Sequence, residues 1–549
     1  MLPISSLLEN LPFDSVVVAA FGVGCLVVLP IALHLLVSSW RRSTDEGKQL
    51  GSDHTTAGGR KIHRLPSTLP LLENTWDVMH AGRGDMHHWN THWGKHFNAE
   101  PVLIRSMGIP DTLFLYTPQA FEDIFKTQFE NFPKGPFMCE NLHDLLGDGI
   151  FAVDGDKWVH QRKTASNLFT MRALRESMTS TIQRHTVVLN GILGRASVNH
   201  ETLDLFKLFN RFTIEAFAEI GFGVHMGCLD SEEEHPFQKA FDRAQRALLF
   251  RFIRPHWFWK AQRWLGVGIE GQLQRDIQVI DSTVLGIVEK ALLHRSSADH
   301  KDGDVKGNDI VSLFLDSLSN SPQAIEQQFD PLYLRDVVVN FLIAGRDTTA
   351  QALSWFFLNL SQNPSVEAKI RNELFEHLLG LRSEEEVIPT MEQVNQLVYL
   401  EAALKETLRL HPSVPLNIKY VLQDTTLSDG TFVAAKSTVS LNTYAMARLP
   451  QVWGPDAEEF KPERWIDRAT GKIINVSAYK FPSFNAGPRM CLGMNLAMLE
   501  MKLVVASLVS KFHIEVLNSE AVTYDLSLTL PVKGALNAKI SHAGYPSYV

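Results

Sequence analysis

Apolar and polar positions follow two different periods along this chain, and the longer runs have the period of an α-helix. Helical patterns cover residues 331–362, 365–379, 394–410 and 492–511. Strand signals are short and scattered, over residues 102–107, 112–116, 419–422, 438–441 and 511–516. No linker after residue 66 is long enough to separate two domains, and polar residues 296–309 are expected to form a surface loop. The pattern therefore predicts one large domain, mainly α with small β-sheets.

The N-terminal pattern is that of a membrane anchor. Residues 15–39 contain no Asp, Glu, Lys or Arg, and at about 1.5 Å per residue they can cross the ~30 Å hydrocarbon layer as one transmembrane helix. Arg41 and Arg42 follow, and since basic residues stay on the cytosolic side, the body of the chain is expected in the cytosol. A cleaved signal peptide is the alternative, but no Lys or Arg precedes the apolar run. Residues 40–65 are expected as a linker and residues 66–549 as the folded domain.

Composition excludes several classes of protein. The chain has 549 residues and a formal net charge of −9, which argues against a nucleic-acid-binding protein. With 45% hydrophobic and 21% charged residues it is globular rather than disordered. Four cysteines are too few for a disulfide framework, so a reducing compartment is expected.

One of these cysteines lies in a loop suited to metal binding. Phe484, Gly487, Arg489, Cys491 and Gly493 stand within ten residues, just ahead of the last helical run. Gly487 can adopt backbone angles closed to other residues and lets a flat ligand approach. The helix start beside Cys491 stabilises a thiolate, and Arg489 offers a cation to a carboxylate. The loop favours a cysteine bound to a metal as an anion; a buried cysteine on a tight turn is the alternative.

This loop resembles the haem-ligating loop of the cytochrome P450 superfamily. The resemblance implies the cytochrome P450 fold, haem b (iron protoporphyrin IX) as the cofactor and Cys491 as the ligand of its iron. It also implies that Phe484, Gly487 and Gly493 surround the cofactor and that Arg489 binds a haem propionate. The resemblance covers roughly residues 66–545.

A second motif joins a helix to a later loop. Glu406 and Arg409 are spaced i, i+3 and share one helix face, as many surface pairs do. Arg464 follows at the distance that the family shows. The resemblance therefore implies that the three form a buried salt-bridged triad, which serves structure and haem retention rather than chemistry.

A third motif is an aromatic–basic pair. Trp158 and Arg162 are spaced i, i+4 on one predicted helix face, where they could form a surface cation–π pair. The resemblance instead implies that both donate hydrogen bonds to a haem propionate. Lys419 falls near the position where many relatives carry an arginine for the same group.

A fourth motif interrupts the most apolar helical run. Gly345 costs about 1 kcal/mol of helix propensity relative to Ala, and Asp347, Thr348 and Thr349 are polar. A bend whose hydroxyls face a buried cavity accounts for both features, and a solvent-facing polar turn is the alternative. The run matches the family's helix-groove motif, which implies that Thr348 hydrogen-bonds bound dioxygen and that Asp347 relays protons.

A histidine-rich segment offers a competing metal site. On a helix, His88, His92 and His96 would stack on one face with a spacing that can bind zinc. No carboxylate lies where a hydrolytic zinc helix needs one, and Trp89 and Trp93 supply a packing face. A partly exposed amphipathic helix is the favoured interpretation.

The resemblance implies a haem-thiolate monooxygenase that inserts one oxygen atom of O2 into a C–H bond of a lipophilic substrate. No Gly-rich dinucleotide fingerprint is evident, so the electrons are expected from a separate NADPH–cytochrome P450 reductase. A single-pass protein of the endoplasmic reticulum membrane, with a cytosolic catalytic domain, fits this arrangement.

Residues 219–229 and 344–364 look like the branch that hydroxylates long-chain fatty acids at or near the terminal methyl. Candidate pocket walls are Phe137, Phe241, Phe252, Phe341, Val414 and Leu530. Sterols, alkanes, secondary metabolites and xenobiotics stay open as substrates. Two other classes are also open: a P450-like isomerase or dehydratase that needs no electrons, although such relatives commonly lose the Asp347–Thr348 pair, and a non-catalytic haem binder.

Overall fold

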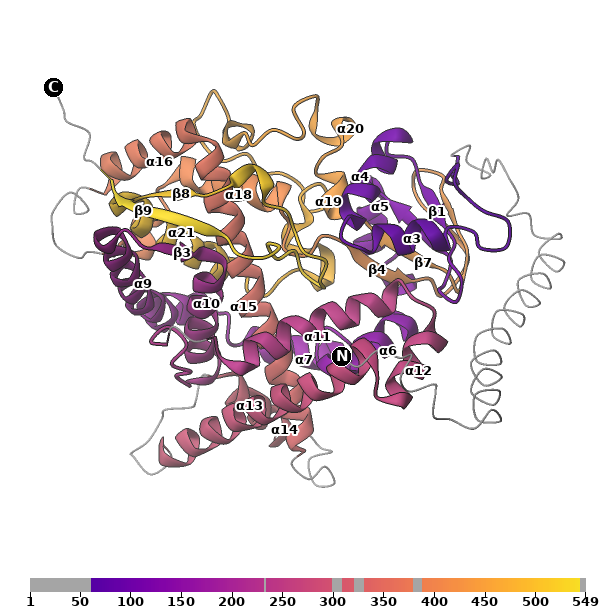
Figure 1. Cartoon of the computed structure of the whole chain (residues 1–549), viewed down its shortest axis with the longest axis horizontal. Helices are drawn as coiled ribbons and strands as arrows, with labels where there is room; N and C mark the ends of the chain where they lie inside the picture. The colour runs from indigo at the N-terminus through magenta and orange to yellow at the C-terminus, as the bar shows by residue number, and fades with distance from the viewer. Residues whose placement is uncertain (1–60, 232–233, 299–308, 320–329, 379–387, 544–549) are drawn as a thin grey trace, which may run out of the picture.

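The computed structural model describes residues 61–231, 234–298, 309–319, 330–378 and 388–543. Helices form most of it, and small sheets lie at two opposite sides of the molecule (Figure 1). This confirms the predicted mainly α architecture with small β-sheets. The helices are α3 (Thr75–Ala81), α4 (Met86–His96), α5 (Pro118–Glu122), α6 (Gly135–Leu146), α7 (Gly155–Ser166), α8 (Met171–Ala173), α9 (Thr179–Asn199), α10 (Leu205–Phe222), α11 (Pro236–Phe252), α12 (His256–Leu265), α13 (Gly268–Ala298), α14 (Ile310–Ser319), α15 (Pro331–Gln362), α16 (Pro364–His377), α17 (Met391–Val394), α18 (Val398–Leu410), α19 (Thr443–Met446), α20 (Pro450–Trp453) and α21 (Met494–Lys511).

The sheets join segments that are far apart in the sequence. The strands are β1 (Val102–Ile104), β2 (Thr112–Leu115), β3 (Thr202–Asp204), β4 (Asn417–Tyr420), β5 (Thr425–Thr426), β6 (Phe432–Val433), β7 (Thr438–Leu441), β8 (Phe512–Val516) and β9 (Asn537–His542). One sheet has the order β1-β2-β7-β4, another β3-β9-β8, and β5 pairs with β6. β2 and β7 are parallel, with Thr112 opposite Thr438. Strand β7 has the predicted bounds, whereas β4 begins before the predicted residue 419.

The apolar run at residues 331–362 forms α15 with the predicted bounds. The side chain of Asp330 accepts the Leu332 N–H at 2.9 Å, and Pro331 stands at the first helical position, so both residues start the helix. Most of its residues are buried, and it packs along α10 through the centre of the molecule (Figure 1). α15 is therefore the central element of the core.

Gly345 does not break this helix, because α15 continues as one α-helix through residues 344–349. A Cβ at Gly345 would lie 2.2 Å from ring atoms of Phe217 on α10. The glycine thus permits close packing of the two helices. The bend that the sequence predicts is not needed to explain it.

The largest difference from prediction concerns residues 394–410, which the pattern assigns to one helix. In the structure only residue 394 of this range belongs to α17, and α18 begins at Val398. The Glu373 carboxylate of α16 accepts the backbone N–H groups of Tyr399 (2.6 Å) and Leu400 (2.8 Å). The free N–H groups in the first turn of α18 thus find their acceptor on another helix, α16. A local sequence pattern cannot reveal such a partner.

The predicted transmembrane segment, residues 15–39, lies outside the described residues, as does the linker up to residue 60. Among the residues that are described, no helix is long and apolar enough to cross a membrane. The last linker residues belong to the body, since His63 accepts the Leu103 N–H at 2.8 Å and Leu65 is buried. Of the predicted loop 296–309, α13 includes the first residues and 299–308 lie outside the described part.

The histidine-rich segment forms the predicted helix, α4. His88 contacts Asp85 through Nδ1 (2.9 Å) and the Tyr444 hydroxyl through Nε2 (3.1 Å). The ring of His92 packs on Trp93. The described part of the chain holds no group of three or more His, Cys, Asp or Glu residues placed to bind a metal.

Candidate cofactor and substrate site

A cavity of about 440 Å³ lies between α15, α21 and the loop that carries Cys491. Its wall is mainly apolar and includes three of the predicted residues: Phe252, Phe341 and Val414. The other three do not line it. Phe137 packs edge-on against Phe252, Phe241 stacks on Phe237, and Leu530 is fully buried. A cavity of this size and character can hold a cofactor or an apolar ligand.

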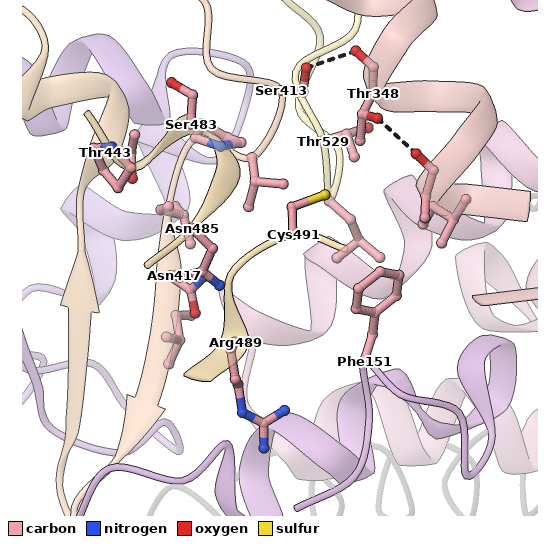
Figure 2. Close-up of a pocket in the computed structure, with 18 of the residues that line it drawn as sticks. Phe151, Thr348, Ser413, Asn417, Thr443, Ser483, Asn485, Arg489, Cys491 and Thr529 are labelled. Carbon is pink, nitrogen blue, oxygen red and sulfur yellow. Dashed lines mark hydrogen bonds between the residues drawn. The ribbon is translucent and has the colours of Figure 1, made fainter. Parts of the chain in front are cut away.

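Cys491 opens on this cavity from a tightly folded loop. Two short 3-10 turns, Pro482–Phe484 and Gly487–Arg489, shape the loop. The Cys491 N–H donates to the Phe484 carbonyl at 2.9 Å, which fixes the cysteine three residues ahead of α21. Figure 2 shows the sulfur projecting from the loop toward the side of the cavity where Thr348 lies. The predicted arrangement of a cysteine before a helix is therefore present.

The two glycines of the loop have different roles. Gly487 has φ +63°, and a Cβ there would lie 1.9 Å from the Phe125 carbonyl oxygen. Any side chain at position 487 would collide with the backbone of Phe125, so a glycine is required there. The sequence instead predicted that this glycine makes room for a flat ligand. A Cβ at Gly493 would meet only ordinary contacts, 3.6 Å from Phe169 and 3.9 Å from the Cys491 sulfur. The backbone N–H of Gly493, rather than its missing side chain, acts on Cys491.

The surroundings of Cys491 do not by themselves produce a thiolate. Burial raises the pKa of the Cys491 thiol, while the Gly493 N–H and the charge of Arg162 act in the opposite direction. A bound metal ion would reverse this balance, because a coordinated thiol loses its proton. The donor at this position therefore fits a metal-bound cysteine.

Cations gather beside the cysteine with too few anions to match them. Arg162, Arg489 and Lys134 line the cavity, and Lys419, which is 1% exposed, is coupled to them electrostatically. Only Arg489 forms an ion pair within the described residues, with Asp154 at 2.6 Å. Burial, reinforced by Arg489, lowers the pKa of Lys134 to about 8, and burial lowers that of Lys419 well below its usual value. Such a cluster needs additional negative charge.

Trp158 connects two of these cations. The guanidinium of Arg489 lies 4.3 Å from the centre of the Trp158 ring, and that of Arg162 lies 5.9 Å away. Arg489 also keeps a buried Nε without a hydrogen-bond partner in the described chain. The predicted cation–π pair of Trp158 and Arg162 therefore lies at the predicted anion-binding site, beside Arg489. Both features fit a haem, whose two propionates are carboxylates and whose iron takes a thiolate.

Thr348 and Asp347 point to different sides of α15. Thr348 lines the cavity, and its Oγ1 donates to the Ala344 carbonyl at 2.7 Å while its own carbonyl accepts from Ser413 at 2.9 Å (Figure 2). Asp347 does not line the cavity. Its carboxylate accepts from Gln245 (2.7 Å) and Arg346 (2.9 Å). The predicted alcohol therefore lies at the cavity, whereas the predicted acid, the adjacent residue along the helix, does not.

A second, polar cavity of about 310 Å³ adjoins α15 at Arg346. Arg346 lines it and pairs with Asp242 at 2.7 Å as well as with Asp347. Burial raises the pKa of Asp347 to about 6, although Arg346 opposes this shift. A carboxyl group with this pKa can take up and release a proton near neutral pH.

The triad Glu406–Arg409–Arg464 has the geometry that the sequence predicts. Glu406 is 0% exposed and accepts from Arg409 Nε and Nη2, both at 2.8 Å, and from Arg464 Nε at 3.3 Å. The Trp465 indole N–H adds a further bond at 2.9 Å. Arg464 also pairs with Asp456 at 2.9 Å. The charges are matched inside the protein and do not line the cavity.

Sequence reasoning missed three residues of the site. Asp154 accepts the N–H groups of Lys134 and Gly135, both at 3.0 Å, and so holds the segment that carries Lys134 against Arg489. Glu500 on α21 lines the cavity, and burial raises its pKa to about 8. A single Lys, Asp or Glu has no local signature, so only the folded chain reveals their positions.

The chain is similar to one family of known proteins over most of its length. A family model described as cytochrome P450 matches residues 65–536. Cytochrome P450 94B1 of Arabidopsis thaliana is 38% identical, over 94% of this chain and 96% of the relative. Cytochrome P450 86B1 of Arabidopsis thaliana is 36% identical, over 76% of this chain and 75% of the relative. Cytochrome P450 704C1 of Pinus taeda is 36% identical, over 78% and 84%.

Proposed function

The chain belongs to the cytochrome P450 family and is a monooxygenase of that family, and we propose that it hydroxylates long-chain fatty acids at or near the terminal methyl. The observation that carries this proposal is the apolar cavity into which Cys491 opens. Apart from Lys134, Arg162 and Arg489, which lie beside Cys491, its wall is mainly apolar and includes Phe252, Phe341 and Val414, so an alkyl chain suits it. A terminal methyl group can therefore pack against the apolar side chains of this wall.

The cofactor we propose is haem b, with Cys491 as the iron ligand. When bound, a thiolate-ligated haem supplies the activation of dioxygen. Arg162, Arg489 and Lys134 would bind the propionates. Phe484 and Gly493, which belong to the ligating loop, would lie beside the cofactor. Gly487 keeps that loop against Phe125. These assignments rest on the excess of positive charge beside Cys491.

Proton supply is the role we propose for the two faces of α15. Thr348 donates its hydroxyl proton to Ala344, so its oxygen is able to accept a hydrogen bond from water in the cavity. Asp347, with a pKa of about 6, would exchange protons with the polar cavity that Arg346 lines. Two consecutive residues of one helix would thus move protons toward the apolar cavity.

We also propose that residues 15–39 anchor the protein in the endoplasmic reticulum membrane, with the catalytic domain, residues 66–549, in the cytosol. Large apolar side chains are exposed on α3 and α12, which lie at one side of the molecule (Figure 1). Trp76 is 65% and Trp264 82% exposed. Such side chains suit a membrane interface. A membrane position would bring the lipophilic substrate and NADPH–cytochrome P450 reductase, the proposed electron donor, to the protein.

The ligand assignment is tested with Cys491→Ala. We expect the variant to lose the red-shifted Soret band that the reduced carbon-monoxide complex of a haem-thiolate protein shows. Cys228→Ala is the matched control, because Cys228 is buried but does not line the cavity. An unchanged band in Cys491→Ala would refute the assignment.

The reaction is tested with purified protein, the reductase, NADPH and a panel of fatty acids, sterols and alkanes. We expect NADPH-dependent oxygen uptake coupled to a hydroxylated fatty acid, identified by product mass. In Thr348→Ala we expect bound haem, with more peroxide released per product. Oxidation of sterols alone would refute the fatty-acid proposal, and unchanged coupling in Thr348→Ala would refute the proton role.

A further inference from the structure

Two polar side chains on α4 lie in the wall of the mainly apolar cavity. His87 and Asn90 stand one helical turn apart, are 3% and 2% exposed, and both line the cavity. His87 Nε2 and Asn90 Oδ1 are buried, and neither has a hydrogen-bond partner in the part of the chain that the structure describes. Since an unpaired buried polar atom costs free energy, two in one wall suggest that a ligand supplies the missing partner.

The orientation of the Asn90 amide is set by a hydrogen-bond network. Asn90 Nδ2 donates to Asn442 Oδ1 at 3.1 Å, and Asn442 Nδ2 donates in turn to the Ser440 carbonyl at 3.0 Å. Ser440 Oγ also donates to Asn442 Oδ1. Because this network needs the Asn90 amide nitrogen as a donor, the unpartnered atom of Asn90 is an acceptor.

The His87 ring is uncharged and held in place. Burial, with His88 and Arg448 acting in the same direction, lowers the pKa of His87 to about 3. The ring lies 5.0 Å from the Tyr524 ring, and the His87 backbone N–H donates to the Tyr524 hydroxyl at 3.1 Å. Arg448 lies over the ring of Tyr444 and does not line the cavity. The ligand therefore meets a neutral imidazole on this wall.

We propose that His87 and Asn90 form a subsite for an uncharged hydrogen-bond donor, a hydroxyl or a secondary amide carried on the substrate's chain, which donates to Asn90 Oδ1 and whose oxygen can accept from His87 Nε2 when that nitrogen carries the proton. A carboxylate only accepts, so the Asn90 oxygen would repel it; a plain methylene would leave both atoms unpaired. Thr443 belongs to α19, which packs against α4, and in Figure 2 it lies on the other side of the cavity from Thr348.

This inference rests on the proposed function, because it requires an acyl chain in the cavity. The test measures, by calorimetry and by the substrate-induced optical shift of the haem protein, the binding of palmitic acid, its monohydroxylated derivatives and N-palmitoyl amino acids. We expect at least one hydroxylated or amide ligand to bind about tenfold more tightly than palmitic acid, as one net buried hydrogen bond provides. The two ligand types distinguish a hydroxyl from an amide.

Two variants test whether His87 and Asn90 cause the tighter binding of the hydroxylated or amide ligand. We expect Asn90→Leu and His87→Phe to bind this ligand no more tightly than palmitic acid, and to bind palmitic acid as before. Thr91→Val is the matched control, because Thr91 is buried on α4, donates to the His87 carbonyl at 2.8 Å and does not line the cavity. If His87→Phe fails to fold, Asn90→Leu decides alone.

The outcomes separate the two proposals. Equal binding of all ligands, or a preference that survives in Asn90→Leu, overturns the subsite but leaves the proposed function intact if palmitic acid is oxidised. Failure of every acyl ligand to bind and react overturns both.

Discussion

Buried charge is arranged in opposite ways at the triad and at the cavity. Around Glu406 every charge has a partner within the chain: the carboxylate is 0% exposed and accepts from Arg409, Arg464 and Trp465. The remaining Arg409 hydrogens reach the backbone carbonyls of Ala447, Ala457 and Glu459. This network is complete without any ligand.

Beside Cys491 the balance is different. Arg162, Arg489, Lys134 and Lys419 share one nearby carboxylate, Asp154, and the pKa values of both lysines are lowered. An anionic ligand would relieve the repulsion within this cluster. In the triad, charged groups that stabilise the fold are paired with other groups of the chain. Beside Cys491, charged groups that could bind a ligand lack enough partners of opposite charge.

The triad should give the largest effect. Glu406→Gln removes the charge that faces two buried guanidinium groups, so we expect it to lower the free energy of unfolding by about 3–5 kcal/mol. Urea denaturation followed by fluorescence measures this. Glu376→Gln, at an exposed position on α16, should change it by less than about 0.5 kcal/mol. A small effect at Glu406 would remove the contrast between the two regions.

Arg489→Met should act on the ligand rather than on the fold. Asp154 keeps the backbone N–H groups of Lys134 and Gly135, so we expect little change in unfolding. Loss of a charged hydrogen bond to a propionate, worth about 1.5–3 kcal/mol, should speed haem transfer to apomyoglobin by about 10–100-fold. Arg172→Met, which alters an exposed pair with Glu176, is the control. Equal transfer rates would contradict an anion site here.

Asp347 is an intermediate case, since it has a cationic partner yet a raised pKa. Between pH 3.8 and about 6 the folded state binds more protons than the unfolded state, so this group makes stability fall as the pH rises through that window. In Asp347→Asn this contribution should be absent. Urea midpoints of both proteins at pH 5 and pH 7 measure the difference. Parallel pH dependence in the two proteins would show that Asp347 is fully ionised throughout.

Lys134 should give the smallest effect and the opposite slope. Between about pH 8 and 10.5 the folded haem-free protein has released a proton that the unfolded chain still holds, so stability rises with pH. Lys134→Met should reduce this rise, to which Lys419 also contributes because its pKa is lowered, and haem binding should reduce it as well, because propionates keep the ammonium groups charged. Denaturation of haem-free and haem-bound protein across this range tests it. A rise that persists with haem bound would place the propionates elsewhere.

Much of the framework could be predicted because its signals are local. The apolar run and its Asp330–Pro331 start set the bounds of α15, and the glycines and Cys491 mark the loop before α21. The break between α17 and α18 could not be predicted, because Glu373 of another helix satisfies the first turn of α18. The roles of Gly345 and Gly487 were also hidden, since Phe217 and Phe125 decide them.

The sequence by itself determined the mainly helical architecture, the cysteine loop and the shared helix face of Glu406 and Arg409, since helical period and short motifs act among near neighbours. That Arg464 joins this pair was implied only by the resemblance to a known family. Only the tertiary structure decided that Lys134, Asp154 and Arg489 meet, that Thr348 lines the apolar cavity while Asp347 does not, and that His87 and Asn90 line the same cavity. Such encounters depend on how distant segments pack together, as when Thr112 pairs with Thr438. The free energy of that packing is a property of the whole fold, which no local pattern contains.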